Sequence, residues 1–244
     1  MELANWKKYF ESNKTHFSDI DWTEEDKLTG IEKEIITHSI QQFQKGENSE
    51  GKHLFAFAKT FPDPQYFECI KLFISEEQMH ARALGKFMNK HSIPEINCHW
   101  VDSIFRWIRK LTGLENSIVV LVTAEIIAKV YYRALMEATS SLLLKKICTQ
   151  ILRDEDQHII FQCSTLCYFY SKKNFLRKIA SRSFHFVLMA GTILIVWVYH
   201  RKVLGAGNYR FSKFYSETIS LFFEAERIVK NKKLLIQKYL VPIP

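Results

Sequence analysis

Apolar residues recur along most of the chain at spacings of three and four, the period of a helix with one buried face. Short breaks that contain proline, serine or glycine interrupt this pattern. The chain is therefore expected to be all-α, with long helices folded back on one another. The four longest predicted helices span Thr23–Lys59, Pro64–Lys90, Glu115–Ala138 and 142–170.

The breaks between these helices predict how they are paired. Pro62 separates the first two helices and Ser140 separates the last two, so each pair is expected to fold as an antiparallel hairpin. The connection between the hairpins holds Ser92–His99 and a short amphipathic segment, Val101–Leu111. A connection of that length predicts a long crossover rather than a tight turn between the hairpins.

Helices are also predicted outside this four-helix region. Met1–Asp21 is polar with scattered aromatic residues, which is typical of a short docking helix. Phe186–Tyr199 is a run of 14 apolar residues, and because a membrane-spanning helix needs roughly 18 or more, we expect a buried fifth helix. Contact of this run with a membrane surface is the less favoured alternative. A last amphipathic helix is predicted over Tyr209–Tyr239.

Composition limits the architecture to one helical domain. The chain has 244 residues, is 47% hydrophobic, and contains only 8 Gly and 5 Pro, so it can bury one large core and has few helix breakers. We expect a single domain over 1–244, with a four-helix bundle over 23–170 and accessory helices over 171–244. The formal charge of +8 comes from scattered Lys and Arg, which gives no strong nucleic-acid signal.

The cysteines favour a reducing, cytoplasmic location. The chain has 5 Cys, an odd number, with no Cys-x-x-Cys, so neither a disulfide framework nor a zinc ribbon is indicated. No apolar run resembling a signal peptide occurs in Met1–Phe17.

The candidate chemistry comes from a Glu-x-x-His motif that occurs in two of the predicted helices. The first copy is Glu77 with His80, and the second is Glu155 with His158. Residues three apart lie on one face of a helix, so each pair can direct a carboxylate and an imidazole at the same point. Apolar neighbours at helical spacing predict that both pairs face the core.

Two further glutamates stand at matching distances from these motifs. Glu47 precedes Glu77 by 30 residues, and Glu125 precedes Glu155 by 30 residues. Hairpins folded midway would bring all four carboxylates to one height, about 22 Å from the turns at 1.5 Å per residue. Burying four carboxylates without counter-ions would cost much of the roughly 5 to 15 kcal/mol that stabilises a domain. Two divalent cations would compensate them, and this oxygen-rich ligand set with one imidazole per ion suits iron or manganese.

One Glu from each of two helices and a Glu-x-x-His from each of two others resembles the ferritin-like, carboxylate-bridged di-iron superfamily. The likeness covers about Thr23 to Tyr170. It implies a ferritin-like bundle that binds two iron ions, with manganese or a mixed pair as alternatives. The six implied ligands, which would also form the catalytic centre, are Glu47, Glu77, His80, Glu125, Glu155 and His158.

The resemblance also implies residues around the ligands. Glu76 and Asp154 precede the two motif glutamates, and each would hold the metal-bound histidine of the opposite hairpin. Glu50, one turn beyond Glu47, is a possible additional or alternative ligand, although the equal offsets favour Glu47. Lys129 is expected to extend towards solvent, and Tyr131 and Tyr132 to be core residues.

The resemblance implies an oxygen-activating enzyme. The leading hypothesis is an oxidase or oxygenase that uses dioxygen to oxidise a small organic substrate. The chain has no Gly-rich nucleotide-binding signature, so electrons are expected from a ferredoxin or a separate reductase. A second copy of the chain is a further possible partner, in a homodimer. The alternatives are a ferroxidase or peroxide-handling iron protein, and an RNA-binding or tRNA-modifying ferritin-like protein.

Overall fold

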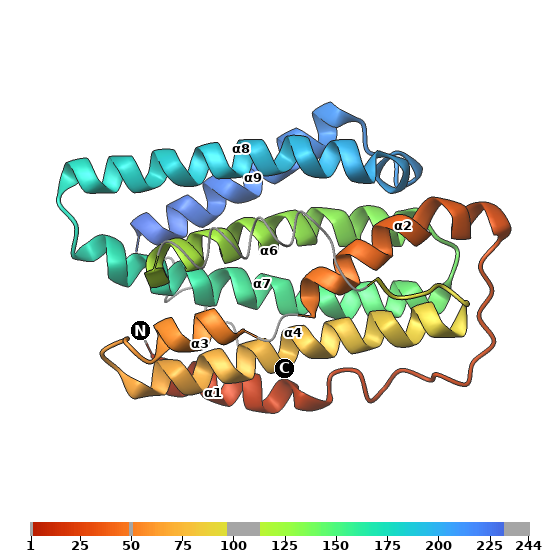
Figure 1. The fold of residues 1–244 in the computed structure, drawn as a ribbon, viewed down its shortest axis with the longest axis horizontal. Coiled ribbons are helices and arrows are strands. Elements are labelled where there is room, and N and C mark those ends of the chain that lie inside the picture. Colours follow the sequence, from red (N-terminus) through yellow and green to blue (C-terminus); the bar gives the residue numbers. More distant parts are fainter. Residues whose placement is uncertain (1, 49–50, 97–112, 232–244) are drawn as a thin grey trace.

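The chain folds into a set of packed helices in the computed structural model, which describes residues 2–48, 51–96 and 113–231. No strand occurs among these residues, so the expected all-α class is confirmed for the part of the chain that is described. The helices, labelled as in Figure 1, are α1 (Leu3–Ser12), the 3-10 turn η1 (Asn13–Thr15), α2 (Gly30–Glu47), α3 (Lys52–Ala58), α4 (Pro64–Lys90), α6 (Gly113–Glu137), α7 (Leu142–Ser171), α8 (Phe175–Ala206) and α9 (Phe211–Lys230).

Four helices form the centre of the molecule. In Figure 1, α2 runs opposite to α4 and α6 runs opposite to α7, and α4 and α7 pack together. The predicted breaks at Pro62 and Ser140 occur because side chains cap the following helices. Asp63 accepts a hydrogen bond from the backbone of Gln65, and Ser141 accepts one from the backbone of Leu144, which satisfies N–H groups that the helix leaves unpaired.

The first long helix differs from the prediction at both ends. Thr23 does not begin it: α2 begins at Gly30, where Thr29 and Glu32 form a reciprocal capping box. The predicted continuation to Lys59 is also wrong, because α2 ends at Glu47 and α3 begins at Lys52.

Gly51 explains why the helix does not continue. Its φ is +63°, a left-handed conformation that breaks the hydrogen-bonding pattern of a right-handed helix. A Cβ placed there would also lie 2.1 Å from the side chain of Ile74, so glycine lets this connection approach α4 closely. A Cβ at the neighbouring Gly46, by contrast, would meet no described atom within 4 Å.

The hydrophobic core consists of two apolar clusters, and the candidate ligands lie between them. One apolar cluster includes Ile70, Phe73 and Ile126, and a second includes Leu84 and Leu144. On α4, the Glu77–His80 motif falls in the sequence between residues of the first cluster and residues of the second. The polar groups are thus placed between two water-excluding layers.

The N-terminal docking helix is confirmed. Trp6 and Phe10 of α1 are almost fully buried, and α1 packs against α4. Phe10 and Trp6 also contact Phe161 of α7, with ring centroids 5.3 and 5.2 Å apart. This helix positions the segment that follows it beside the central helices.

The prediction of a buried fifth helix over Phe186–Tyr199 is wrong in length and in burial. The helix α8 runs from Phe175 to Ala206, and only 28% of its most apolar 18-residue window is buried. By length and composition, this helix would be able to cross a membrane. The physical reason for the error is that hydropathy alone does not say whether both faces of a helix are covered.

Three expectations lie outside the described residues. They are the role of Glu50, the amphipathic segment Val101–Leu111, and the last part of the predicted helix Tyr209–Tyr239, of which α9 describes Phe211–Lys230.

Candidate metal centre

The structure brings together all six side chains that the sequence singled out. Glu47 comes from α2, Glu77 and His80 from α4, Glu125 from α6, and Glu155 and His158 from α7. Ligand atoms of these residues form two overlapping groups in which all atoms lie within 4.8 Å of one another. The first group is Glu47, Glu77, His80 and Glu155, and the second is Glu77, Glu125, Glu155 and His158.

The two groups share two of the four glutamates. Glu77 and Glu155 belong to both groups, whereas each of the other residues belongs to one. His80 Nδ1 lies 3.8 Å from both Glu77 Oε1 and Glu155 Oε1, and His158 Nδ1 lies 3.0 Å from Glu77 Oε1. The two motif glutamates are therefore at the positions where bridging carboxylates between two cations would be needed.

Several of the converging atoms have no hydrogen-bond partner of suitable geometry among the described residues. These buried atoms are Glu77 Oε1, His80 Nδ1, both carboxylate oxygens of Glu155 and His158 Nδ1. Buried polar atoms are normally satisfied, and leaving one without a partner costs about 1 to 3 kcal/mol. Cations at this position would satisfy all of them, so the residues present fit a dinuclear metal centre.

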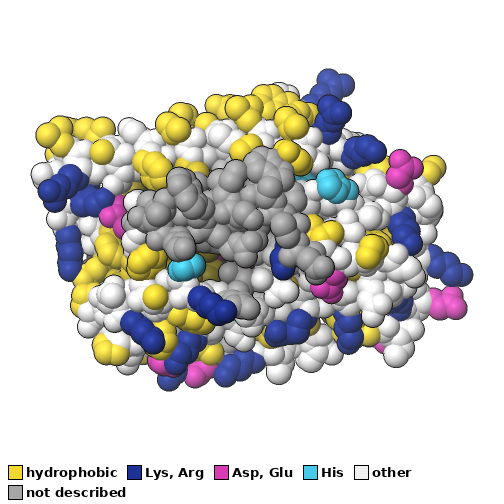
Figure 2. Space-filling model, viewed as in Figure 1, with side chains coloured by type: hydrophobic (Ala, Val, Ile, Leu, Met, Phe, Trp, Pro, Cys, Tyr) yellow, Lys and Arg dark blue, Asp and Glu magenta, His cyan; other side chains and the backbone are white. Residues whose placement is uncertain are grey.

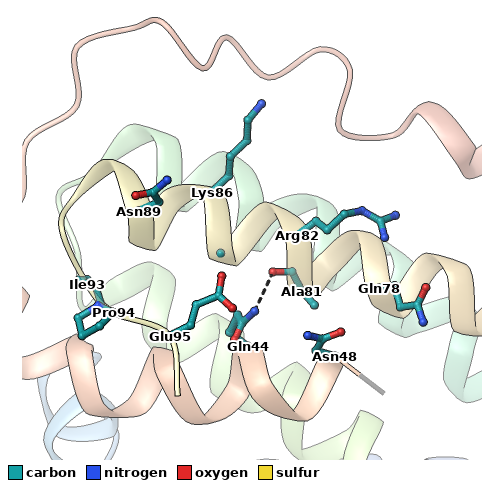
Figure 3. A pocket seen from close by; sticks show the side chains of 11 residues that line it. Gln44, Asn48, Gln78, Ala81, Arg82, Lys86, Asn89, Ile93, Pro94 and Glu95 are labelled. Atoms are coloured by element: carbon teal, nitrogen blue, oxygen red, sulfur yellow. Dashed lines mark hydrogen bonds between the residues drawn. The ribbon is translucent and has the colours of Figure 1, made fainter. Parts of the chain in front are cut away.

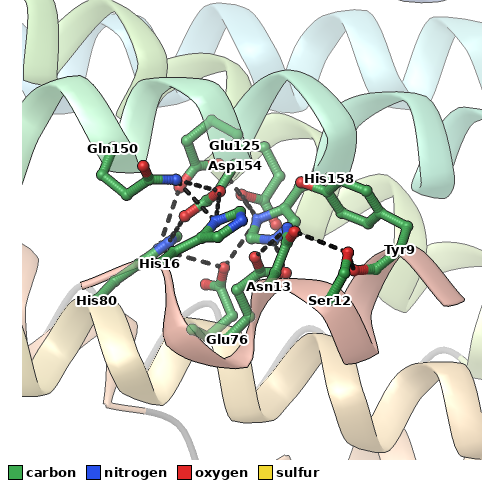
Figure 4. A network of polar contacts seen from close by, with 12 residues as sticks. Tyr9, Ser12, Asn13, His16, Glu76, His80, Glu125, Gln150, Asp154 and His158 are labelled. Atoms are coloured by element: carbon green, nitrogen blue, oxygen red, sulfur yellow. Dashed lines mark hydrogen bonds and ion pairs between the residues drawn. The ribbon is translucent and has the colours of Figure 1, made fainter. Parts of the chain in front are cut away.

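The second ring nitrogen of each histidine is held by an acid from the opposite hairpin (Figure 4). His80 Nε2 lies 3.0 Å from Asp154 Oδ2, and His158 Nε2 lies 3.3 Å from Glu76 Oε2. These are the two contacts expected from the sequence. Each acid fixes the orientation of an imidazole whose Nδ1 faces the candidate metal positions.

The segment after α1 supports these acids in turn, and no sequence pattern predicted this support. Asn13 donates a hydrogen bond to Glu76 Oε1 at 2.8 Å, and His16 Nδ1 lies 3.0 Å from Asp154 Oδ1. Gln150 also donates to Asp154 Oδ1 at 2.9 Å. No periodic pattern links residues before α2 to a motif in α7, so only the folded chain reveals them.

Tyr132 is both a core residue and part of the centre. Its ring is fully buried, as expected, and its hydroxyl donates a 2.6 Å hydrogen bond to Glu47 Oε1. Tyr132 lies two turns after Glu125 on α6, a spacing that would have indicated a shared face. Lys129, by contrast, pairs with the half-exposed Asp156, but its own side chain is only 12% exposed, so it reaches a surface acid rather than extending into solvent as predicted.

The pKa values show how crowded the buried charges are. Burial raises the pKa of Glu47 well above its ordinary value, and the charge of Glu77 raises it further. Burial and the charge of Glu125 do the same for Glu155. Burial lowers the pKa of His158, but the carboxylates of Glu125 and Glu155, each 3.7 Å from His158 Nδ1, outweigh it and raise the pKa well above its usual range. Without cations, the cluster therefore retains protons that metal binding would displace.

Comparison with known proteins does not name this chain's family. No protein-family model matches the sequence, and no curated protein is significantly similar to it. The interpretation of the centre therefore depends on its own geometry and chemistry.

Aromatic rings surround the two histidines. Phe73 and Phe10 lie against His158 at centroid distances of 4.8 and 6.2 Å, and Phe17 lies 5.9 Å from His80. These rings exclude water from one side of the cluster, which strengthens electrostatic interactions inside it.

A polar cavity of about 700 Å³ lies beside the α2 and α4 helices (Figure 3). Gln44 and Ala81 contribute to its wall, and Gln44 donates a hydrogen bond to the Ala81 carbonyl oxygen at 3.4 Å. Its charged lining residues are Arg82, Lys86 and Glu95. None of the six candidate ligands is among the described residues that line it, so it is a neighbour of the centre rather than its interior.

Changing Asp154 to asparagine is expected to weaken metal binding without removing a ligand. Asparagine keeps the shape but not the charge that holds His80 Nε2, and loss of such a contact typically lowers metal affinity about 10- to 100-fold. Competition with a metal chelator would measure the affinity. The control is Asp156→Asn, which changes the same charge at the surface partner of Lys129. Equal affinity in the two variants would contradict the positioning role of Asp154.

Proposed function

We propose that the chain is a ferritin-like di-iron protein that activates dioxygen to oxidise a small organic substrate. The observation that carries this proposal is the pair of overlapping Glu/His groups that share Glu77 and Glu155. Four carboxylates and two imidazoles give an oxygen-rich set, which favours iron or manganese over a closed zinc site. Hydrogen bonds alone do not satisfy this set among the described residues, so a purely structural polar cluster is a poorer account of it.

The proposed ligand assignment follows from the two groups. Glu47 and His80 would hold one ion, Glu125 and His158 would hold the other, and Glu77 and Glu155 would lie between them. When bound, a pair of ferrous ions supplies the electrons and open coordination positions that dioxygen reduction requires.

The chain's own residues would control orientation, water and protons. Asp154 and Glu76 keep the imidazoles turned towards the centre, and the aromatic rings beside the histidines limit water access. Tyr132 directs its hydroxyl proton at Glu47 Oε1, which biases that carboxylate towards using its other oxygen as a ligand. An external electron donor, a ferredoxin or a reductase, is part of the proposal. Repeated turnover needs a supply of electrons, and the chain has no nucleotide-binding signature of its own to provide them.

The test is anaerobic loading of the full-length protein with ferrous iron, followed by a pulse of dioxygen. We expect two ferrous ions per chain and rapid dioxygen consumption that a panel of organic substrates alters, with oxidised substrate detected by mass spectrometry. Dioxygen consumption that depends only on iron would favour a ferroxidase instead. Failure to bind two ions of iron or manganese would overturn the dinuclear proposal.

A further inference from the structure

The outward face of α8 is apolar along most of the length of the helix. Leu176, Val187, Leu194 and Val198 are 74%, 68%, 57% and 63% exposed. They follow one another at intervals of 11, 7 and 4 residues, which returns to nearly the same side of a helix. Exposed aromatic residues of the neighbouring α9, such as Phe211 and Tyr215, extend this surface. We call the exposed apolar residues of α8 and α9 the α8 face.

The α8 face lacks the charges that a water-facing helix normally carries. No Asp, Glu, Lys or Arg occurs between Arg182 and Arg201. At 1.5 Å per residue, this gap corresponds to about 27 Å of helix. A surface helix of a soluble domain usually has charged residues opposite its buried stripe, and a large exposed apolar surface commonly marks an interaction site.

The opposite side of α8 is fixed to the bundle. Met189 and Ile193 are fully buried, and α8 packs against α6, α9 and α2. Figure 1 shows α8 lying lengthwise along the central helices. If α8 crossed a bilayer in this packing, the helices beside it would enter the bilayer too, together with polar loops that lipid cannot satisfy. The geometry therefore suits a helix that lies in the plane of a membrane surface rather than one that spans it.

The charges at the ends of α8 are all of one sign. The helix contains no acidic residue and five basic ones: Arg177, Lys178, Arg182, Arg201 and Lys202. They lie near its two ends, on either side of the apolar stretch. Figure 2 shows hydrophobic side chains along the upper margin of the molecule, where α8 lies, with Lys and Arg side chains at both ends of that margin.

This charge pattern distinguishes between two occupants of the face. If two copies of α8 paired with each other, basic ends would meet basic ends in either a parallel or an antiparallel arrangement, with no acid on either helix to compensate. Arg182 is already paired with Glu226 of α9 and Lys202 with Glu34 of α2. Anionic lipid headgroups would compensate Arg177, Lys178 and Arg201 while the acyl chains cover the apolar stretch.

From the exposed apolar stripe, its basic ends and its attachment to the bundle, we propose that the α8 face docks this protein on the surface of an anionic lipid bilayer. This surface is separate from the Glu/His cluster, so the membrane-docking proposal does not depend on which reaction the candidate metal centre performs.

The test is flotation of the full-length protein with two kinds of vesicle, one of phosphatidylcholine alone and one of phosphatidylcholine and phosphatidylglycerol in equal parts. We expect binding to the anionic vesicles, weaker binding to the neutral ones, and a decrease as salt is added, because salt screens surface charges. Light scattering on the lipid-free protein would measure its assembly state in parallel.

Two variants separate the apolar and basic contributions. Val187→Ser with Leu194→Ser and Val198→Ser should lower binding to anionic vesicles by about tenfold or more, because each buried methylene contributes to partitioning. Arg177→Gln with Lys178→Gln and Arg201→Gln should lower it by about tenfold on anionic vesicles and leave binding to neutral vesicles unchanged. Helix content and metal stoichiometry, measured on the same samples, should match the unchanged protein.

Matched controls make the same chemical changes on other elements. Ile31→Ser with Leu142→Ser removes apolar side chains that are 74% and 60% exposed on α2 and α7. Lys8→Gln with Lys14→Gln and Lys27→Gln removes three exposed charges outside α8. Both controls should bind vesicles like the unchanged protein. Equal losses in controls and α8 variants, no flotation with either vesicle, or a dimer that only the apolar α8 variant disrupts would overturn the proposal.

Discussion

Replacing Glu77 or Glu155 by alanine is expected to abolish binding of both metal ions. Each of these residues belongs to both ligand groups, so its loss removes an oxygen from two sites at once. Changes to residues around metal ligands already cost about 10- to 100-fold in affinity, and loss of a carboxylate that belongs to both ligand groups should cost more. Metal content after equilibration with a limited excess of iron or manganese would be measured by elemental analysis, and dioxygen consumption should fall with it.

Alanine substitutions of two other glutamates, one on the surface and one in a single ligand group, provide the controls. Glu68→Ala lies on the same helix as Glu77 but removes a half-exposed carboxylate that pairs with Lys71 at the surface, and it should bind both ions normally. Glu47→Ala should weaken mainly one ion, since Glu47 belongs to only one group. Full retention of both ions in the Glu77 and Glu155 variants would refute the ligand assignment.

The stability of the metal-free protein is expected to fall as the pH rises, and added metal is expected to reverse this trend. Glu47, Glu155 and His158 have raised pKa values in the folded state. Their contribution is therefore complete below their ordinary values of 4.5 and 6.5 and is lost as the pH rises through the folded pKa values. Glu125 acts oppositely: burial raises its pKa, but its close neighbours Glu155 and His158 outweigh this and lower it, so its contribution is lost only in acid.

Metal ions bind the deprotonated ligands, so their stabilising effect should grow over the same pH range. Free metal at about 100 times its dissociation constant adds about 2.7 kcal/mol per site to the free energy of unfolding. Urea unfolding at several pH values, with chelator and with manganese under identical conditions, would measure both trends. Parallel curves with and without metal would contradict a buried, proton-linked metal centre. The Glu77→Ala protein, which should not respond to metal, is the matched control.

The central helices and the Glu/His cluster could be predicted from the sequence because both depend on regular residue spacing. The three-residue interval within each motif fixes a shared helix face, and the two 30-residue offsets fix the height of the remaining glutamates in each hairpin. Capping side chains at Asp63 and Ser141 are local signals that mark where the turns occur. These spacings and caps give the same geometry wherever the helices form, so they can be recognised without the tertiary structure.

The features that were missed depend on three-dimensional context. Thr23 and Thr29 are both plausible helix starts; Thr29 and Glu32 match the capping-box pattern, and their reciprocal contact in the folded chain shows that the helix begins there. The exposure of the outward face of α8 could not be predicted, because an apolar sequence has the same hydrophobic pattern whether or not other helices pack against every face. His16 reaches Asp154 across 138 residues of sequence, for which a linear pattern carries no information.

The contacts of Asn13 and His16 have a consequence for the order in which the centre assembles. Their partners lie 63 and 138 residues further along the chain, so closing these contacts costs more loop entropy than pairing neighbouring helices. Hairpins should consequently form before the N-terminal segment settles onto them. During that interval the centre would be accessible from the side that this segment later closes, which gives ions a natural time of entry during the biogenesis of the protein.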